Sequence, residues 1–162
     1  MRQTGGVGVL RIATEGRFFE PAATGGDLAV IVPDYRIDED GGAELVDLIG
    51  FRINTPSKTW VRTGHTRALG SWHADAIRDA MPIWRLPNDP PPPVLKIYRT
   101  PLSWLRAACD GACILNTDWV DYVLSGVEAV VAENALHARH LHEALPKRGL
   151  PKILLREERT AA

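Results

Sequence analysis

Residues 27–51, DLAVIVPDYRIDEDGGAELVDLIGF, set the pattern for the first half of the chain. Two apolar runs, residues 27–34 and 44–51, flank a stretch rich in acidic residues and glycine. Such runs, separated by turn-forming residues, are typical of β-strands joined by a hairpin. The sequence therefore predicts two neighbouring strands and a solvated loop between them. The acidic residues assigned to this loop are Asp34, Asp38, Glu39 and Asp40.

Similar short runs occur on either side of this hairpin. VGVLRIA (7–13) precedes it and KTWVRTG (58–64) follows it, each bounded by glycine or polar residues. Four such runs predict a β-rich first half, folded as a meander or a small curved sheet.

The second half of the chain alternates between two kinds of pattern. Strand-like runs are VLKIYR (94–99), ACILN (112–116) and PKILLRE (151–157); helix-like segments are TPLSWLRAAC (100–109) and ENALHARHLHEAL (133–145). VEAVVA (127–132) fits a strand or the start of a helix. Alternation of this kind predicts helices packed on a small sheet, so the expected fold class is α+β.

The length of 162 residues fits one domain with its own core, and we expect a single domain over residues 1–162. Ser71 is a candidate N-cap for a helix over residues 72–81. The proline run that follows favours an extended polyproline segment. Residues 88–93 are therefore expected to be a stiff connector between the two halves.

Composition indicates the compartment and the classes of partner. The formal net charge of −1 disfavours a protein that coats nucleic acid or a membrane surface over its whole area. The start of the chain lacks the apolar core of a secretion signal, and no run approaches a membrane span. We expect a cytoplasmic protein without membrane association, and a fold that needs no cofactor; the oligomeric state is left open.

Two cysteines, Cys109 and Cys113, allow two interpretations. Thr100-Pro101 fits the start of a helix, and Gly111 fits the left-handed conformation that closes one. On that interpretation both thiols pack as small apolar groups. The alternative is a zinc site formed by Cys109, Cys113, His137 and His140. Packing is favoured, because the histidines are only three positions apart and follow the cysteines at an unusually long interval.

The acidic loop suggests a second metal hypothesis. Clustered carboxylates bind the divalent cations of nucleases, and Asp34, Asp38 and Asp40 would supply them here. Pro33-Asp34 matches the start of the PD-(D/E)xK nuclease motif, but the next apolar run contains no lysine. A solvated turn is the simpler interpretation.

A cationic stretch, FRINTPSKTWVRTGHTRALG (51–70), follows the acidic one and contains no acidic residue. Cations contact phosphates and aromatic rings stack on bases, so this pattern fits nucleic-acid binding. It also fits an edge strand protected by cations, with Trp60 packed in the core. We call the candidate binding residues the basic strip: Arg52, Lys58, Trp60, Arg62 and Arg67.

Three segments together resemble a group of uncharacterised proteins encoded in proteobacterial prophages and mobile elements. They are AELVDLIGF (43–51), TWVRTGHTRALG (59–70) and TPLSWLRAACDGACIL (100–115), so the resemblance covers residues 43–116. It implies a setting in phage or plasmid DNA metabolism and supplies no catalytic residues.

The function expected from the sequence is that of a non-enzymatic accessory protein of a prophage or mobile element. Its basic strip would bind DNA or RNA, or a replication or host protein that processes nucleic acid. One alternative is a metal-dependent hydrolase or nuclease that uses the acidic loop. The other is an inhibitor or scaffold that binds protein.

Overall fold

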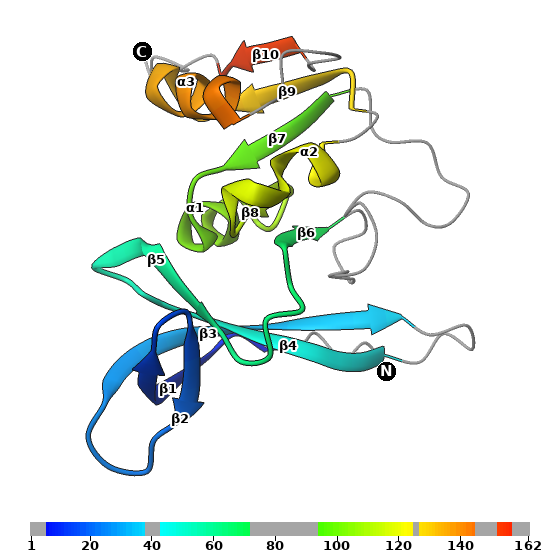
Figure 1. Ribbon diagram of the computed structural model, residues 1–162. Coiled ribbons are helices and arrows are strands. Elements are labelled where there is room, and N and C mark those ends of the chain that lie inside the picture. Colours follow the sequence, from blue (N-terminus) through cyan, green and yellow to red (C-terminus); the bar gives the residue numbers. More distant parts are fainter. Residues whose placement is uncertain (1–5, 38–42, 72–93, 125–126, 145–151, 157–162) are drawn as a thin grey trace.

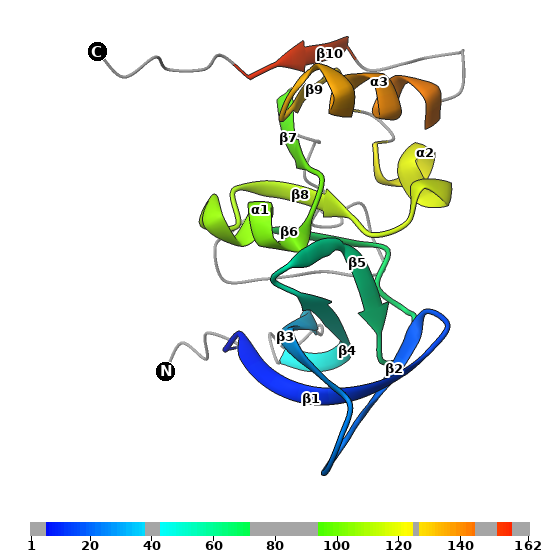
Figure 2. The ribbon, with the colours of Figure 1, turned by 90° about the vertical axis from the view of Figure 1, so that its left-hand side faces the viewer.

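The fold class predicted from the sequence is confirmed: the protein is α+β and rich in β-structure. The computed structural model describes residues 6–37, 43–71, 94–124, 127–144 and 152–156. Its strands form two sheets, a closed barrel at one end of the molecule and a second sheet at the other (Figures 1 and 2). No helix within these ranges is long and apolar enough to cross a bilayer.

The first half of the chain closes into a five-stranded barrel. Its strands are β1 (Gly8–Glu15), β2 (Phe18–Pro21), β3 (Asp27–Ile37), β4 (Ala43–Arg52) and β5 (Thr55–Val61). β3, β4 and β5 form an antiparallel meander, as the apolar runs predict. β1 pairs with both β2 and β3, and β2 closes the barrel by pairing with β5 in parallel, with Phe18 opposite Val61.

Apolar side chains lie on both faces of β3 and β4, and both faces are buried. Ala29 and Ile31 belong to the cluster inside the barrel, whereas Val32 belongs to a cluster on its outer side. Ile49 and Phe51 of β4 join that outer cluster. Because successive strand residues point to opposite faces, one face fills the barrel and the other is available to pack on a second layer.

The second sheet has the strand order β10-β9-β7-β8-β6. Its strands are β6 (Ala68–Ser71), β7 (Val94–Tyr98), β8 (Gly111–Ile114), β9 (Ala129–Ala132) and β10 (Lys152–Leu155). All neighbouring pairs are parallel except β6 and β8. The run at residues 127–132, which the sequence left open, is a strand.

Helices cover this sheet on its two faces. α2 (Val120–Val123) and α3 (Ala135–Ala144) pack on one face, through a cluster that contains Leu95, Val130 and Leu141. α1 (Pro101–Arg106) lies on the other face, near the barrel (Figure 2). Thr100 caps α1 by accepting the Ser103 N–H, and Pro101 occupies the first turn, as the Thr-Pro pair predicts.

One buried cluster joins the barrel to the second sheet. It combines Phe51 and Val61 of the barrel with Leu69 and Cys113 of the sheet and with Trp104 of α1. Trp104 is fully buried, and its indole N–H donates to the Gly111 carbonyl at 3.1 Å. The single domain over residues 1–162 stays a prediction, and the predicted helix 72–81 and connector 88–93 lie outside the described residues.

Candidate functional site

Trp60 of the basic strip lies inside the barrel. Its side chain is 1% exposed and packs with Ile12 and Phe19. Gly50 is its partner on β4 and leaves room beside it: a Cβ at Gly50 would lie 3.4 Å from Ile31. The aromatic residue of the predicted surface is therefore a core residue, and it presents no exposed face on which a base could stack.

Two of the four cations of the strip form ion pairs with carboxylates. Arg52 forms an ion pair with Asp27, and Arg62 forms one with Glu20. Lys58 is exposed and its ammonium lies 5.2 Å from the centre of the Trp60 ring. These contacts make the face around Arg52 and Arg62 a mixed-charge surface, which is a weaker site for phosphates than the sequence suggests.

Arg67 stands apart from the other strip residues, at the junction between the barrel and the second sheet. It lines a pocket of about 330 Å³, which we call the junction pocket. The polar lining residues are Arg17, Thr59, His65, Thr66, Arg67 and Asn116. Val61, Gly64, Leu115 and Trp119 complete the lining.

Three segments far apart in the sequence form this pocket. Arg17 comes from the turn between β1 and β2, and its carbonyl accepts the Val61 N–H at 2.9 Å. The second segment is the end of β5, with Thr59 and Val61, and the loop of residues 62–67 that links β5 to β6. The third segment runs from Leu115 to Trp119, after β8, and the Leu115 N–H donates to the Arg67 carbonyl at 3.0 Å.

A buried carboxylate shapes the 62–67 loop. Asp47 of β4 is 2% exposed and accepts five backbone N–H groups. The donors, at 2.8–3.2 Å, are Leu48, Arg62, Thr63, Gly64 and Thr66. Burial by itself raises the pKa of Asp47, but the hydrogen bonds from Thr63, Thr66 and Leu48 outweigh it and lower the pKa below its ordinary value. The loop is therefore held around a charged carboxylate.

Asp34 supports the same loop. It lies within β3, opposite Asp47, and is completely buried, so its assignment to a solvated turn was wrong. The strand continues past it because β3 and β4 remain paired as far as Ile37 and Ala43. The Thr66 hydroxyl donates to the Asp34 carboxylate. Asp38, Glu39 and Asp40 lie outside the described residues.

The charge and the ring contacts of the pocket favour an anionic ligand. None of the described residues that line it is acidic, whereas Arg17 and Arg67 bring two guanidinium groups from separate elements. The Arg67 guanidinium lies 4.0 Å from the centre of the Trp119 ring, a cation–π stack. Trp119 is 36% exposed, so this tryptophan, unlike Trp60, has ring surface open to solvent.

His65 completes the polar side of the pocket. It is exposed, and its Nδ1 lies 2.9 Å from the Thr63 hydroxyl. Gly64 before it takes a φ of +85°, and its carbonyl accepts a hydrogen bond from Arg17 at 3.4 Å. The left-handed conformation at Gly64 turns the loop toward Arg17, and a Cβ there would lie 3.0 Å from the guanidinium.

The residues of the hypothetical zinc site do not come together. Cys113 is fully buried in the cluster between the sheets, and Cys109 packs at its edge. Burial raises the pKa of both thiols, which favours the neutral, apolar form. Among the described residues no three His, Cys, Asp or Glu side chains are grouped to hold a metal ion.

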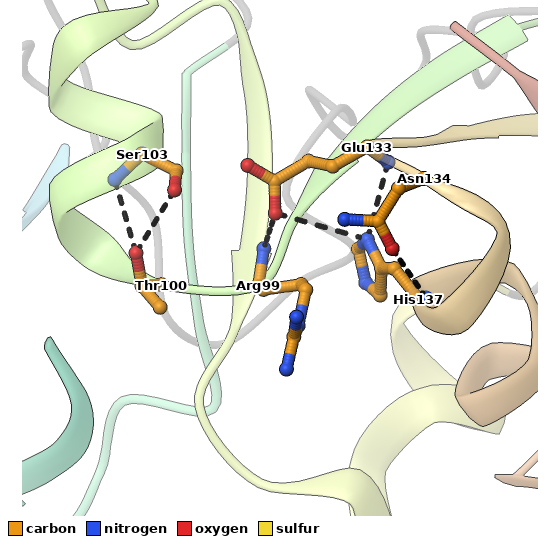
Figure 3. A network of polar contacts seen from close by, with 6 residues as sticks. All are labelled: Arg99, Thr100, Ser103, Glu133, Asn134 and His137. Atoms are coloured by element: carbon orange, nitrogen blue, oxygen red, sulfur yellow. Dashed lines mark hydrogen bonds and ion pairs between the residues drawn. The ribbon is translucent and has the colours of Figure 1, made fainter.

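His137 belongs to a network at the carboxyl ends of β7 and β9 (Figure 3). Its Nδ1 accepts the Glu133 N–H at 3.3 Å, and its own N–H donates to the Asn134 side chain at 2.9 Å. The Glu133 carboxylate accepts the Arg99 N–H at 2.7 Å. Burial lowers the pKa of His137 to about 4, so the ring is neutral at pH 7 and fastens the start of α3 to β9.

The turn after α1 differs from the expected closure at Gly111. Ala108 and Cys109 adopt positive φ angles of 55° and 61°, so they, rather than the glycine, take the left-handed conformation that ends the helix. Gly111 has a φ of +110°, and a Cβ there would overlap the Lys96 carbonyl. Its role is close packing against β7, beside the ion pair between Lys96 and Asp110.

No family model matches the chain, and no curated protein or solved structure is significantly similar to it. The site therefore rests on its geometry. Sequence reasoning selected Arg67 but missed Arg17, Asn116 and Trp119, which lie 50, 49 and 52 positions from it along the chain. The presence of Trp119 shortly after a predicted strand was the one sequence signal that could have pointed to the pocket. Its exposure to solvent, which makes it a candidate for stacking, cannot be read from the sequence.

Proposed function

We propose that the protein is a non-enzymatic nucleic-acid-binding protein and that the junction pocket is its binding site. The resemblance of residues 43–116 to prophage and mobile-element proteins supports a setting in phage or plasmid DNA metabolism. Free thiols at Cys109 and Cys113 agree with the reducing conditions of the cytoplasm. The proposed site keeps Arg67 of the basic strip and replaces Trp60 by Trp119.

The observation that carries the proposal is the combination of two arginines and an exposed tryptophan around a pocket lined by no described acidic residue. Guanidinium groups bind phosphates in a bidentate manner, and aromatic rings stack on bases. The Asp47 carboxylate holds the loop that places Arg67, so the site is preorganised before a ligand binds.

The metal-dependent hydrolase gains no support from the described residues. Of its three carboxylates only Asp34 is described, and that side chain is buried and bonded to Thr66. A protein partner remains the competing class of ligand, and the experiment below separates it from nucleic acid.

The test is an anisotropy titration of the purified chain against labelled DNA and RNA at several salt concentrations. We expect log affinity to fall linearly with log salt, because phosphate contacts release counterions. Arg17→Ala and Arg67→Ala should each weaken binding about tenfold and flatten the salt slope by about 0.7–0.9. Arg11→Ala, which removes an exposed arginine from β1 away from the pocket, is the matched control and should bind normally.

Absence of binding to DNA and RNA at the lowest salt concentration would refute the proposal. So would binding that Arg17→Ala and Arg67→Ala leave unchanged while far-UV circular dichroism shows that both variants are folded. A captured protein partner whose binding does not change in Arg17→Ala or Arg67→Ala would indicate the inhibitor or scaffold class.

A further inference from the structure

We infer that the junction pocket receives one unpaired nucleotide of a strand, with its base on Trp119 and its phosphate on Arg17 and Arg67. This inference rests on the proposed function and specifies its ligand. It predicts single-stranded rather than double-stranded nucleic acid as the preferred partner.

The shape of the site favours an unpaired base. A cavity of about 330 Å³ is at the small end of ligand pockets, a size for one small ligand rather than for the width of a duplex. Bases inside a duplex are covered on both faces by their neighbours. Only an unpaired or flipped base can bring a π-face to a ring that lies within a pocket.

Trp119 and Arg67 provide the stacking surface. Their ring and guanidinium are already stacked at 4.0 Å, and both are planar groups that stack on bases. A base can lie against this pair, and the positive charge of Arg67 is then close to the phosphate that follows this nucleotide in the strand. Val61 and Leu115 add apolar lining to the same pocket.

Arg17 offers a second phosphate contact from a separate element. Its guanidinium donates to the Gly64 carbonyl over a long distance, 3.4 Å, and lies over the Phe18 ring at 5.2 Å. A phosphate is a stronger acceptor than a carbonyl at that distance, because both partners are charged. Binding would therefore exchange a weak contact for a charge-assisted one.

Two polar side chains of the pocket, Asn116 and Thr66, already form hydrogen bonds within the protein. Asn116 accepts the Asp118 N–H at 3.0 Å and donates to the Asp118 carboxylate at 3.3 Å. The Thr66 hydroxyl donates to Asp34. Base edges are read by hydrogen bonds, so these engaged side chains predict that the pocket accepts different bases with similar affinity.

The experiment compares a labelled single strand with the duplex of the same sequence, for the wild-type chain, Trp119→Phe and Trp119→Leu. We expect the single strand to bind at least about tenfold more tightly than the duplex. Trp119→Leu, which keeps apolar area but removes the aromatic face, should remove most of this preference; Trp119→Phe should retain most of it. Oligo(dT) and oligo(dA) should bind within about threefold of each other.

Each other outcome overturns the inference. Equal affinity for single strand and duplex, or a preference that survives Trp119→Leu, refutes the unpaired nucleotide and leaves the proposed function standing. Binding of neither form at low salt refutes the proposed function and the inference together. Urea denaturation of both Trp119 variants shows whether either effect comes from loss of folding.

Discussion

The basic strip on the barrel and the junction pocket contain the same kinds of residue, arranged in opposite ways. In the strip, Trp60 is buried and Arg52 and Arg62 are paired with Asp27 and Glu20. In the pocket, Trp119 is exposed and no described lining residue is acidic. Proximity in the sequence made the strip conspicuous, but the fold brings Arg52 and Arg62 beside carboxylates of β3 and β2.

The difference shows why cations clustered in the sequence do not by themselves identify a binding surface. Charges that are adjacent along a strand alternate between two faces, and each face is completed by side chains from neighbouring strands. Arg17 and Arg67 lie in a turn and a loop rather than in strands, and the fold brings them together around an open pocket. The following predictions test whether the two regions are as different as their contacts indicate.

The largest expected effect separates the two tryptophans by stability. Trp60→Ala should lower the free energy of unfolding by about 3–5 kcal/mol, because it empties the barrel core. Trp119→Ala should lower it by about 1 kcal/mol or less, since the ring is partly exposed and loses mainly the stack with Arg67. Urea denaturation followed by far-UV circular dichroism measures both values.

If Trp60→Ala does not fold, Trp60→Phe leaves a smaller cavity and should still lose more stability than Trp119→Ala. Equal losses at the two positions would contradict the contrast between a core ring and a surface ring.

A second prediction concerns Asp47, the carboxylate that holds the 62–67 loop beside the pocket. Asp47→Asn should cost about 3 kcal/mol, because one amide oxygen cannot satisfy five buried N–H donors. The matched control is Asp27→Asn, which removes an exposed ion pair and should cost about 0.5 kcal/mol. Similar losses in the two variants would show that the 62–67 loop does not depend on Asp47.

The direction of the pH effect of Asp47 follows from its lowered pKa. The carboxylate stabilises the fold at pH values above its unfolded pKa, near 3.8, and the contribution is lost as the pH falls through the still lower folded pKa. The wild type should therefore approach the stability of Asp47→Asn only in strongly acidic solution.

The third prediction defines the pH range in which the two regions can be compared. His137, which lies in neither region, has a folded pKa of about 4 against 6.5 in the unfolded chain. Because the unfolded state binds the proton more tightly, stability is full above pH 6.5 and falls toward pH 4. We expect a loss of about 1.5 kcal/mol between pH 6.5 and pH 5.

His137→Gln should abolish this pH dependence, whereas His140→Gln, at an exposed position of the same helix, should retain it. A wild-type stability that is flat from pH 6.5 to pH 5 would show that His137 is not held neutral. Binding at the pocket is best measured above this range.

The smallest expected effect lies in the strip itself. Arg62→Ala and Lys58→Ala should change nucleic-acid affinity by less than about twofold, because Arg62 is matched by Glu20 and both lie outside the pocket lining. Anisotropy against the same labelled strand measures this beside Arg67→Ala. A loss as large as that of Arg67→Ala would show that the surface around Lys58 and Arg62 also binds nucleic acid.

Local patterns predicted most of the elements, whereas contacts between distant segments were not predictable. The apolar runs gave β3 and β4, and Thr100-Pro101 gave the start of α1. β2 and β6 were missed because their segments, FFEP and ALGS, contain too few apolar residues in alternation or in a run. β8, β9 and β10 are equally short but lie in longer apolar runs. Barrel closure by β2 and β5 joins residues 43 positions apart, which no local pattern encodes.

The same limit applies to the candidate site. Arg67 was selected because cations cluster near it in the sequence. Asp47 lies in the apolar run 44–51, where nothing in the sequence marks it, although it holds a loop 15 to 19 positions further along. The sequence does not distinguish Trp60 from Trp119. Only the structure shows that the first ring is buried and the second is exposed.

The strand order has a consequence for synthesis on the ribosome. Residues 8–61 contain every strand of the barrel, so it can close before β7 has been translated. Its outer apolar face, with Val32, Ile49 and Phe51, stays uncovered until Trp104 of α1 has been synthesised and can pack on it. On a ribosome paused between these segments, the barrel would be closed but its outer apolar face would be exposed to solvent. A chaperone that binds apolar surface would act on the nascent chain at this stage.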